Sequence, residues 1–87
     1  MNKQKMNILV VDDDPSVIEM VSDLLIEEQY NVMVAPNGEA ALEVGFNESP
    51  DLIIMDWEMP IMDGISALKN FKSNASTKNT PVIMITG

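Results

Sequence analysis

The amino-acid sequence predicts an α/β fold in which one doubly wound parallel sheet carries helices on both faces. Continuous apolar runs at residues 8–11, 52–55 and 82–85 suit strands that are buried on both faces, and a weaker run lies at 32–35. Amphipathic helical patterns alternate with these four runs. This alternation implies parallel strands joined by right-handed crossovers, with helices on both sides of the sheet.

Each expected helix begins at a capping signal. Asp14-Pro15, Asn37-Gly38 and Asp63-Gly64 each place a capping side chain before a helical pattern. The side chains expected to face inward are, in the first helix, Val17, Ile18, Val21, Leu24 and Leu25; in the second, Ala40, Ala41, Val44 and Phe46; in the third, Ile65, Leu68 and Phe71. Residues 73–80 form a polar loop before the last strand.

Composition excludes several kinds of chemistry. The 87 residues carry 14 acidic and 5 basic side chains, a net charge of −9, with no His, no Cys and no Arg. A catalytic imidazole, a thiol nucleophile, a Cys/His zinc site and a disulfide framework are therefore absent from these residues. The acidic balance argues against a nucleic-acid surface. We expect one domain over residues 7–87, preceded by a polar tail at 1–6.

The apolar segments of the sequence are too short for a signal peptide or a membrane span. The apolar run behind the N-terminus is only four residues long and stops at three aspartates, unlike a signal peptide. No stretch approaches the ~20 apolar residues of a membrane span. We therefore expect a cytoplasmic protein that does not associate with membranes.

Carboxylates follow two of the predicted strands at the point where each strand ends. Asp12 and Asp13 follow the first strand and Asp56 the third, while Thr86 follows the fourth. Ligands of open α/β sheets bind beyond the carboxyl ends of the strands. Like charges held close together there are unfavourable unless a cation binds between them. Mg²⁺ binds one or two carboxylates of a protein together with the phosphate of a substrate. A carboxylate beside Mg²⁺ can also accept a phosphoryl group.

Neighbouring residues are explained by structural roles and need no ligand. Asp14 is expected to be the helix cap, because Pro15 follows it. Thr86 by itself would be an ordinary strand-end hydroxyl, and Trp57 is expected to be a packing residue.

At these residues the sequence resembles the receiver domain of two-component response regulators. The resemblance rests on residues 8–13, 37–42, 51–64 and 81–86, and it covers essentially everything from Asn7 onward. It implies a flavodoxin-like receiver fold with strand order 2-1-3-4-5. The chain stops at Gly87, so the resemblance also implies that the family's C-terminal helix-strand-helix is lacking after the fourth strand.

The resemblance implies a role for each site residue. Asp56 would accept a phosphoryl group from a phosphohistidine of a sensor histidine kinase or phosphotransfer protein. Asp13 and Asp56 would bind Mg²⁺ directly, together with the backbone carbonyl of Glu58, and Asp12 would reach the ion through water. The Thr86 hydroxyl would contact the phosphoryl group and move with the switch. The chain would catalyse at most its own phosphotransfer and dephosphorylation.

The sequence departs from the family at two points. Glu58 adds an acid two residues after Asp56, where family members often have a neutral or basic residue. The Lys that the family carries on its fifth strand has no counterpart among the five lysines. We therefore also consider a receiver-like interaction module that is not phosphorylated.

Two further expectations come from the same residues. A haloacid-dehalogenase-like phosphatase, with Asp12 as nucleophile and Asp14 as general acid, is the enzyme alternative. The strand at 82–85 would be an edge with apolar side chains on both faces, and such an edge invites pairing with another chain. We therefore expect self-association through residues 82–85.

Overall fold

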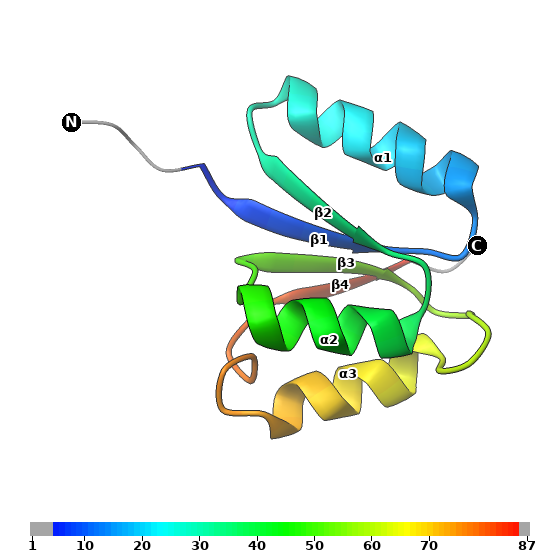
Figure 1. Ribbon diagram of the computed structural model, residues 1–87, viewed down its shortest axis with the longest axis vertical. Coiled ribbons are helices and arrows are strands. Elements are labelled where there is room, and N and C mark those ends of the chain that lie inside the picture. The colour runs from blue at the N-terminus through cyan, green and yellow to red at the C-terminus, as the bar shows by residue number, and fades with distance from the viewer. Residues whose placement is uncertain (1–4, 86–87) are drawn as a thin grey trace.

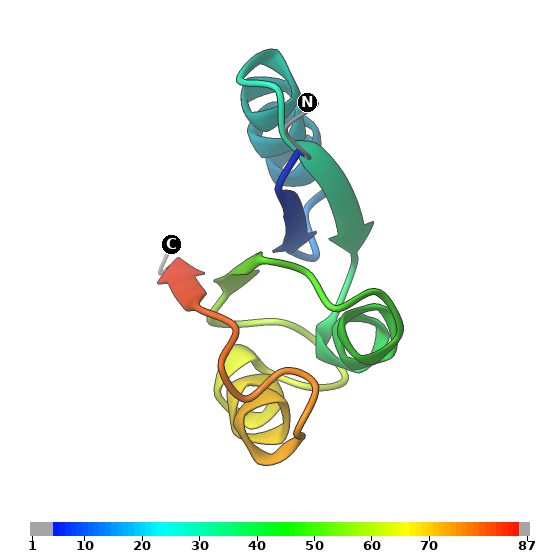
Figure 2. The ribbon, with the colours of Figure 1, turned by 90° about the vertical axis from the view of Figure 1, so that its left-hand side faces the viewer.

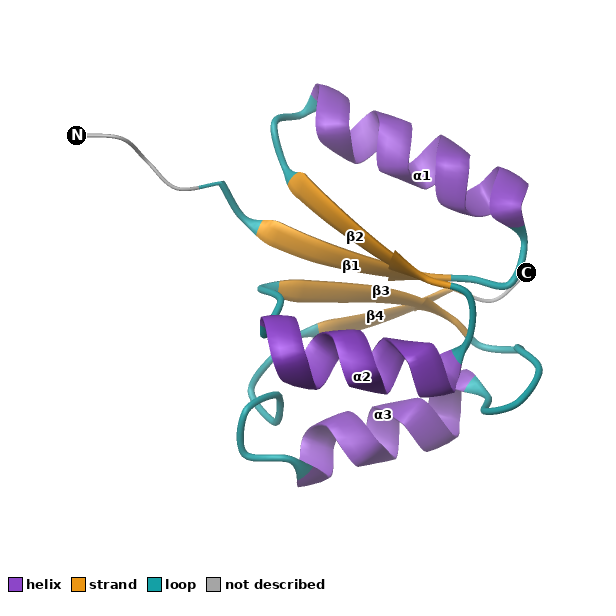
Figure 3. Cartoon of the chain, in the orientation of Figure 1, coloured by secondary structure: helices purple, strands orange, loops and turns teal. Residues whose placement is uncertain are grey.

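The structure is a computed structural model that describes residues 5–85 (Figures 1 and 3). Its elements in chain order are β1 (Asn7–Val11), α1 (Pro15–Glu27), β2 (Asn31–Ala35), α2 (Gly38–Glu48), β3 (Leu52–Asp56), α3 (Gly64–Ser73) and β4 (Val82–Ile85). All seven predicted elements are confirmed. A polar tail at residues 1–6 stays a prediction, because residues 1–4 lie outside the described part of the chain.

The four strands form one parallel sheet in the order β2-β1-β3-β4, as the family resemblance implied. In register, Val11 of β1 lies beside Ala35 of β2 and Met55 of β3, and Met55 lies beside Met84 of β4. Because all strands run the same way, their carboxyl ends meet at one edge of the sheet.

Helices cover both faces of this sheet (Figure 2). α1 lies against β1 and β2 on one face, whereas α2 and α3 pack side by side on the other. Each helix starts at its predicted cap: Asp14 accepts a hydrogen bond from the Ser16 amide, Asn37 from that of Ala40 and Asp63 from that of Ser66. Within residues 5–85, no helix has both the length and the apolar character needed to cross a membrane.

The main hydrophobic core lies between the sheet and the α2–α3 layer. Phe71 of α3 is fully buried and meets the ring of Phe46 of α2 edge to face, with the ring centres 5.9 Å apart. The buried cluster consists of Leu9, Val11, Ala35, Ala41, Ile53, Met55, Ala67 and Phe71. Packing of this kind fixes the two strands whose ends carry the acidic residues.

The opposite face is less well covered than the sequence predicts. No residue of α1 is fully buried, and Leu24 is 59% exposed, so the expectation that it faces the core is wrong. Ile83 of β4 is 52% exposed, so burial of this strand on both faces is also wrong. The reason is that α1 lies over β1 and β2, and no other helix of the described residues lies on that face.

Candidate functional site

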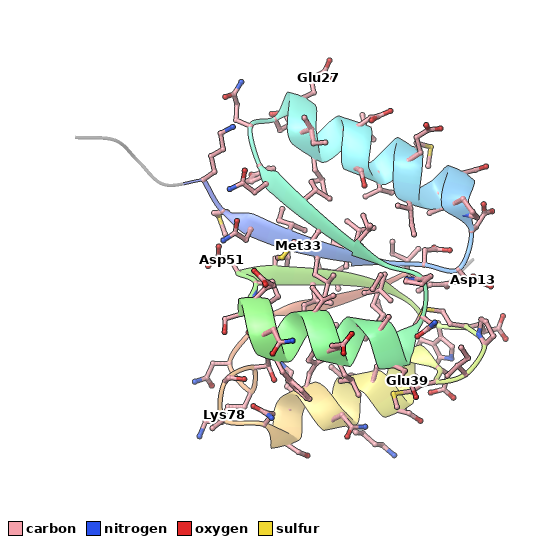
Figure 4. All side chains as sticks on the ribbon, in the orientation of Figure 1. Asp13, Glu27, Met33, Glu39, Asp51 and Lys78 are labelled. Atoms are coloured by element: carbon pink, nitrogen blue, oxygen red, sulfur yellow. The ribbon has the colours of Figure 1, made fainter. Side chains whose placement is uncertain are left out.

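Three carboxylates converge where β1 and β3 end. One oxygen from each of Asp12, Asp13 and Asp56 lies within 4.8 Å of the others. The convergence follows from topology, because β1 and β3 are adjacent parallel strands with Val11 in register with Met55. Figure 4 places Asp13 at this end of the sheet, whereas Asp51 lies at the opposite end. The sequence prediction that these three residues meet is therefore confirmed.

The three side chains differ in their access to solvent. Asp12 is only 6% exposed, Asp56 is half-buried and Asp13 is exposed. A carboxylate buried as deeply as that of Asp12 is unfavourable unless hydrogen bonds or a cation compensate it. The site is thus closed around Asp12 and open at Asp13 and Asp56, where a ligand can enter.

Backbone amides two residues downstream hold two of the carboxylates. The Asp14 amide donates to Oδ1 of Asp12 at 2.9 Å, and the Glu58 amide donates to Oδ1 of Asp56 at 3.4 Å. This arrangement, in which an Asp side chain bonds the backbone two residues on, is the Asx turn. The two acids are therefore oriented by the chain that immediately follows each strand.

Burial raises the pKa of the Asp12 carboxyl above its usual value. The hydrogen bond from the Asp14 amide opposes that shift, while the negative charges of Asp56, Asp13 and Asp14 add to it. The buried acid therefore lies where its ionised form is disfavoured in the absence of a cation. A divalent cation would reverse the balance by attracting all three carboxylates.

The donor set suits a hard divalent cation. All three side chains offer oxygen, and Mg²⁺ and Ca²⁺ prefer oxygen ligands. Glu58, whose backbone carbonyl is the fourth predicted ligand, follows Asp56 by two residues in the loop that leaves β3. The residues present thus fit the metal that the sequence predicts.

The loop after Asp56 connects the site to β4 and α3. The Trp57 amide donates to the carbonyl of Ile85 at 2.9 Å, and the Gly64 amide donates to the carbonyl of Trp57 at 2.9 Å. Trp57 itself is 44% exposed, so the expectation that it is mainly a packing residue is wrong. Its indole therefore has access to solvent, and its backbone directly follows Asp56.

Two other predicted residues have different outcomes. Asp14 caps α1 as expected, and its carboxylate accepts the Ser16 amide at 2.9 Å. Thr86 lies outside the described residues, and its predicted role stays a prediction.

The backbone amides that orient the acids were not predicted from the sequence. These donors belong to Asp14 and Glu58, two residues after Asp12 and Asp56. An aspartate at the end of a strand, followed directly by a turn, is the signal that predicts such an Asx turn.

Comparisons with known proteins agree on one family. The response regulator receiver domain family matches residues 8–87. Over 79 residues, which are 91% of this chain, the sequence is 37% identical to the response regulator PleD of Caulobacter vibrioides and 43% identical to the transcriptional regulatory protein CpxR of Escherichia coli. The match spans only 17% of PleD and 32% of CpxR.

A solved structure shows the same fold. The chemotaxis response regulator CheY4 of Vibrio cholerae superposes with a TM-score of 0.90 at 34% sequence identity. The superposition covers 93% of this chain and 68% of the CheY4 chain. The helix-strand-helix expected after the fourth strand is not part of the residues described here, which end at β4.

Proposed function

The chain belongs to the family of response regulator receiver domains, and we propose that it accepts a phosphoryl group on Asp56 in a two-component signalling system. The donor is the phosphohistidine of a sensor histidine kinase or of a phosphotransfer protein. The position of Asp56 carries the proposal: its half-buried carboxylate lies at a strand end beside Asp12 and Asp13. The 87 residues contain no His, so they supply the acceptor and not the histidine donor.

Mg²⁺ is the proposed cofactor. Asp13 and Asp56 would hold the ion directly with the backbone carbonyl of Glu58, and the more deeply buried Asp12 would act through water. When bound, the ion offsets the negative charge of the acids and of the incoming phosphoryl oxygens. Support comes from the oxygen-only donor set and from the raised pKa of Asp12.

The chain's own contribution to phosphotransfer is the positioning of a nucleophile. An Asp56 carboxylate oxygen forms a bond to phosphorus while the bond from phosphorus to the donor imidazole nitrogen breaks. The electron pair of the broken bond stays on that nitrogen, and the product is an aspartyl phosphate. The Glu58 amide holds the Oδ1 atom of Asp56 at 3.4 Å, which orients the carboxylate. Thr86 is proposed to contact the phosphoryl group from the end of β4.

Phosphorylation is tested with acetyl phosphate and Mg²⁺, followed by mass mapping of the labelled residue. We expect one phosphate on Asp56 and none on Asp56→Asn. Asp51→Asn is the matched control, because it removes a carboxylate just before β3, at the opposite end of that strand from Asp56. We expect the reaction to be slow, since the acidic side chain of Glu58 repels an anionic donor.

The outcome also separates the alternatives. A phosphate mapped to Asp12 would favour the haloacid-dehalogenase-like phosphatase. Against that reading, the carboxylate of Asp14, its required general acid, is engaged as the cap of α1. Absence of any label in a folded sample would favour the interaction module that is not phosphorylated.

Metal binding has its own test in the fluorescence of Trp57. Titration with Mg²⁺ should change the emission of this exposed indole, because it directly follows Asp56. Asp13→Ala should abolish the response, whereas Asp23→Ala, with the same loss of charge on α1, should retain it. An identical titration in Asp13→Ala and the parent would remove Asp13 from the site.

We place this function in the cytoplasm, with a protein phosphodonor as partner and without nucleic acid or membrane. The acidic net charge of −9 supports the exclusion of nucleic acid. No turnover of a separate substrate is proposed; the reactions are the chain's own phosphotransfer and dephosphorylation.

Self-association of the 87-residue chain through Val82–Ile85 is a second proposal. Its support is the 52% exposure of Ile83 on the outermost strand of the described sheet and the 59% exposure of Leu24 on the same side. Exposed apolar side chains on an edge strand favour pairing with a strand of another chain.

Sedimentation of the 87-residue chain at micromolar concentration tests this proposal. We expect a species above monomer mass, and Ile83→Lys should shift it toward monomer or unfolded chain. Ile26→Lys is the control, because Ile26 is similarly exposed on α1 but lies two residues from Leu24 and therefore on another face of the helix. A stable monomer of the parent chain would contradict the proposal.

A further inference from the structure

The loop that leaves Asp56 contains a strained turn. Ile61 has a φ of 73°, and the Met62 amide donates to the carbonyl of Pro60 at 2.8 Å. A hydrogen bond between residues i and i+2, with a positive φ at the residue between them, is the rare and strained form of the γ-turn. A β-branched residue is unfavourable in this conformation. Something outside the turn must therefore stabilise it.

The first residue of α2 contacts this turn directly. Gly38 is buried, and a Cβ atom placed on it would lie 2.5 Å from the Met62 carbonyl oxygen and 3.0 Å from the Met62 side chain. The glycine is held in place by its helix, because Asn37 accepts the Ala40 amide at 2.8 Å and caps α2. The backbone of Met62 thus rests in the space that a side chain at position 38 would fill.

The other end of the loop is fixed to the site. The Gly64 amide bonds the Trp57 carbonyl at 2.9 Å, and a Cβ on Gly64 would lie 2.5 Å from the backbone oxygen of Asp56. Residues 57–63 are therefore confined between the starts of α2 and α3. A displacement of Met62 has little room to be absorbed before it reaches Glu58, whose amide bonds Asp56.

We propose that Gly38 is a positioning residue for the metal site: its missing side chain lets α2 hold the γ-turn at Ile61, and the held turn fixes the Glu58 backbone and the Asp56 carboxylate. This inference rests on the proposed Mg²⁺ site but concerns an element that contributes no ligand. An added methyl group meets a backbone oxygen, which cannot rotate away as the end of a side chain can. The turn must then move, and the site moves with it.

Gly38→Ala tests the proposal, with Gly45→Ala as the matched control. Gly45 lies on the same buried side of α2, roughly 10 Å further along the helix, and a Cβ there would meet the Phe71 ring in the core. Both substitutions crowd α2, but only Gly38→Ala crowds the loop. Substitution of a residue that orients metal ligands without binding the metal typically lowers metal affinity about 10–100-fold. We therefore expect Mg²⁺ affinity to fall about tenfold in Gly38→Ala and by less than about twofold in Gly45→Ala.

A readout without metal separates this inference from the proposed function. The emission maximum of Trp57 in metal-free protein should shift in Gly38→Ala and stay unchanged in Gly45→Ala, because Trp57 belongs to the confined loop. If the parent binds no Mg²⁺ but this shift occurs, the metal site fails while the coupling of Gly38 to the loop stands. Unchanged Trp57 emission in folded Gly38→Ala would overturn the inference.

A rescue variant excludes simple destabilisation. Glycine adopts positive φ freely, so Ile61→Gly lets the turn absorb the shift of Met62 locally. We expect Gly38→Ala/Ile61→Gly to recover the parent emission maximum and most of the Mg²⁺ affinity. Failure of this recovery, with Gly38→Ala losing affinity, would assign the effect to general unfolding and contradict the positioning role.

Discussion

The two faces of the sheet carry equally apolar side chains but bury them to different extents. On the α2–α3 face, Ile53 and Phe71 are fully buried. On the α1 face, Val10, Ile54 and Ile83 lie in register across three strands, and their exposure rises from 2% at Val10 through half-buried Ile54 to 52% at Ile83. The residue types are alike, so the difference comes from which helices lie above them.

This comparison shows how the site is supported. The α2–α3 face packs around β1 and β3, the strands that end in the acidic cluster. The start of α2 and the start of α3 also confine the loop after Asp56. The more closely packed side of the molecule is thus the side that orients Asp56, while the α1 face leaves apolar surface available for contact.

The largest expected effect is the loss of Phe71. Phe71→Ala should lower the free energy of unfolding by about 3–5 kcal/mol, because it opens a cavity between α2 and α3. Leu24→Ala on the exposed side of α1 should cost less than about 1 kcal/mol. Urea denaturation of both variants measures the contrast. Equal losses would show that Leu24 is covered in solution.

Neighbouring isoleucines on β3 provide a sharper version of the comparison. Ile53→Ala should cost about 2–5 kcal/mol, since its side chain is fully buried toward α2 and α3. Ile54→Ala, directed to the α1 face, should cost clearly less because solvent already reaches that side chain. Denaturation midpoints and slopes of the pair give the result. A larger loss for Ile54→Ala would show that the α1 face, and not the α2–α3 face, is the more closely packed one.

The end of α1 offers a stabilising change on the weaker face. Gln29 has a φ of 76°, and the Tyr30 amide donates to the Leu25 carbonyl at 3.1 Å, as at a helix end closed by a left-handed residue. Gln29→Gly should raise the free energy of unfolding by about 0.5–1 kcal/mol, because glycine adopts this conformation without strain. Thermal denaturation measures the gain, and Gln29→Ala should show none.

The smallest effect is a dependence on pH at the cap of α3. The Ser66 amide, which donates to Asp63 at 2.8 Å, lowers the pKa of this carboxyl below 3.8. At pH values between the lowered pKa and 3.8, the folded protein therefore binds fewer protons than the unfolded chain. The ionised cap stabilises the fold above this range, and the stabilisation is lost as pH falls through the lowered pKa.

Asp63→Asn should consequently be less stable than the parent at neutral pH, with the difference shrinking below pH 3.8. Urea denaturation at several pH values measures this difference, and Glu43→Gln on exposed α2 surface is the control for charge alone. A difference that does not change with pH would mean that hydrogen-bond geometry, and not charge, explains the cap.

The sequence determined the elements and most of the site. Helix starts at Asp14, Asn37 and Asp63 were predictable because a cap bonds an amide only two or three residues away. The convergence of Asp12, Asp13 and Asp56 was also predictable, since parallel strands bring their carboxyl ends to one edge. The order of the strands came from the family resemblance and not from any residue pattern.

Only the tertiary structure decided burial and the support of the site. The apolar pattern of α1 predicted that Leu24 faces the core, but a periodic pattern cannot tell which part of an apolar face another element covers. Likewise, nothing local to Gly38 indicates that the Met62 carbonyl, 24 residues later, lies against it. Local hydrogen bonds and strand direction are set within a few residues, whereas close packing depends on how distant elements meet.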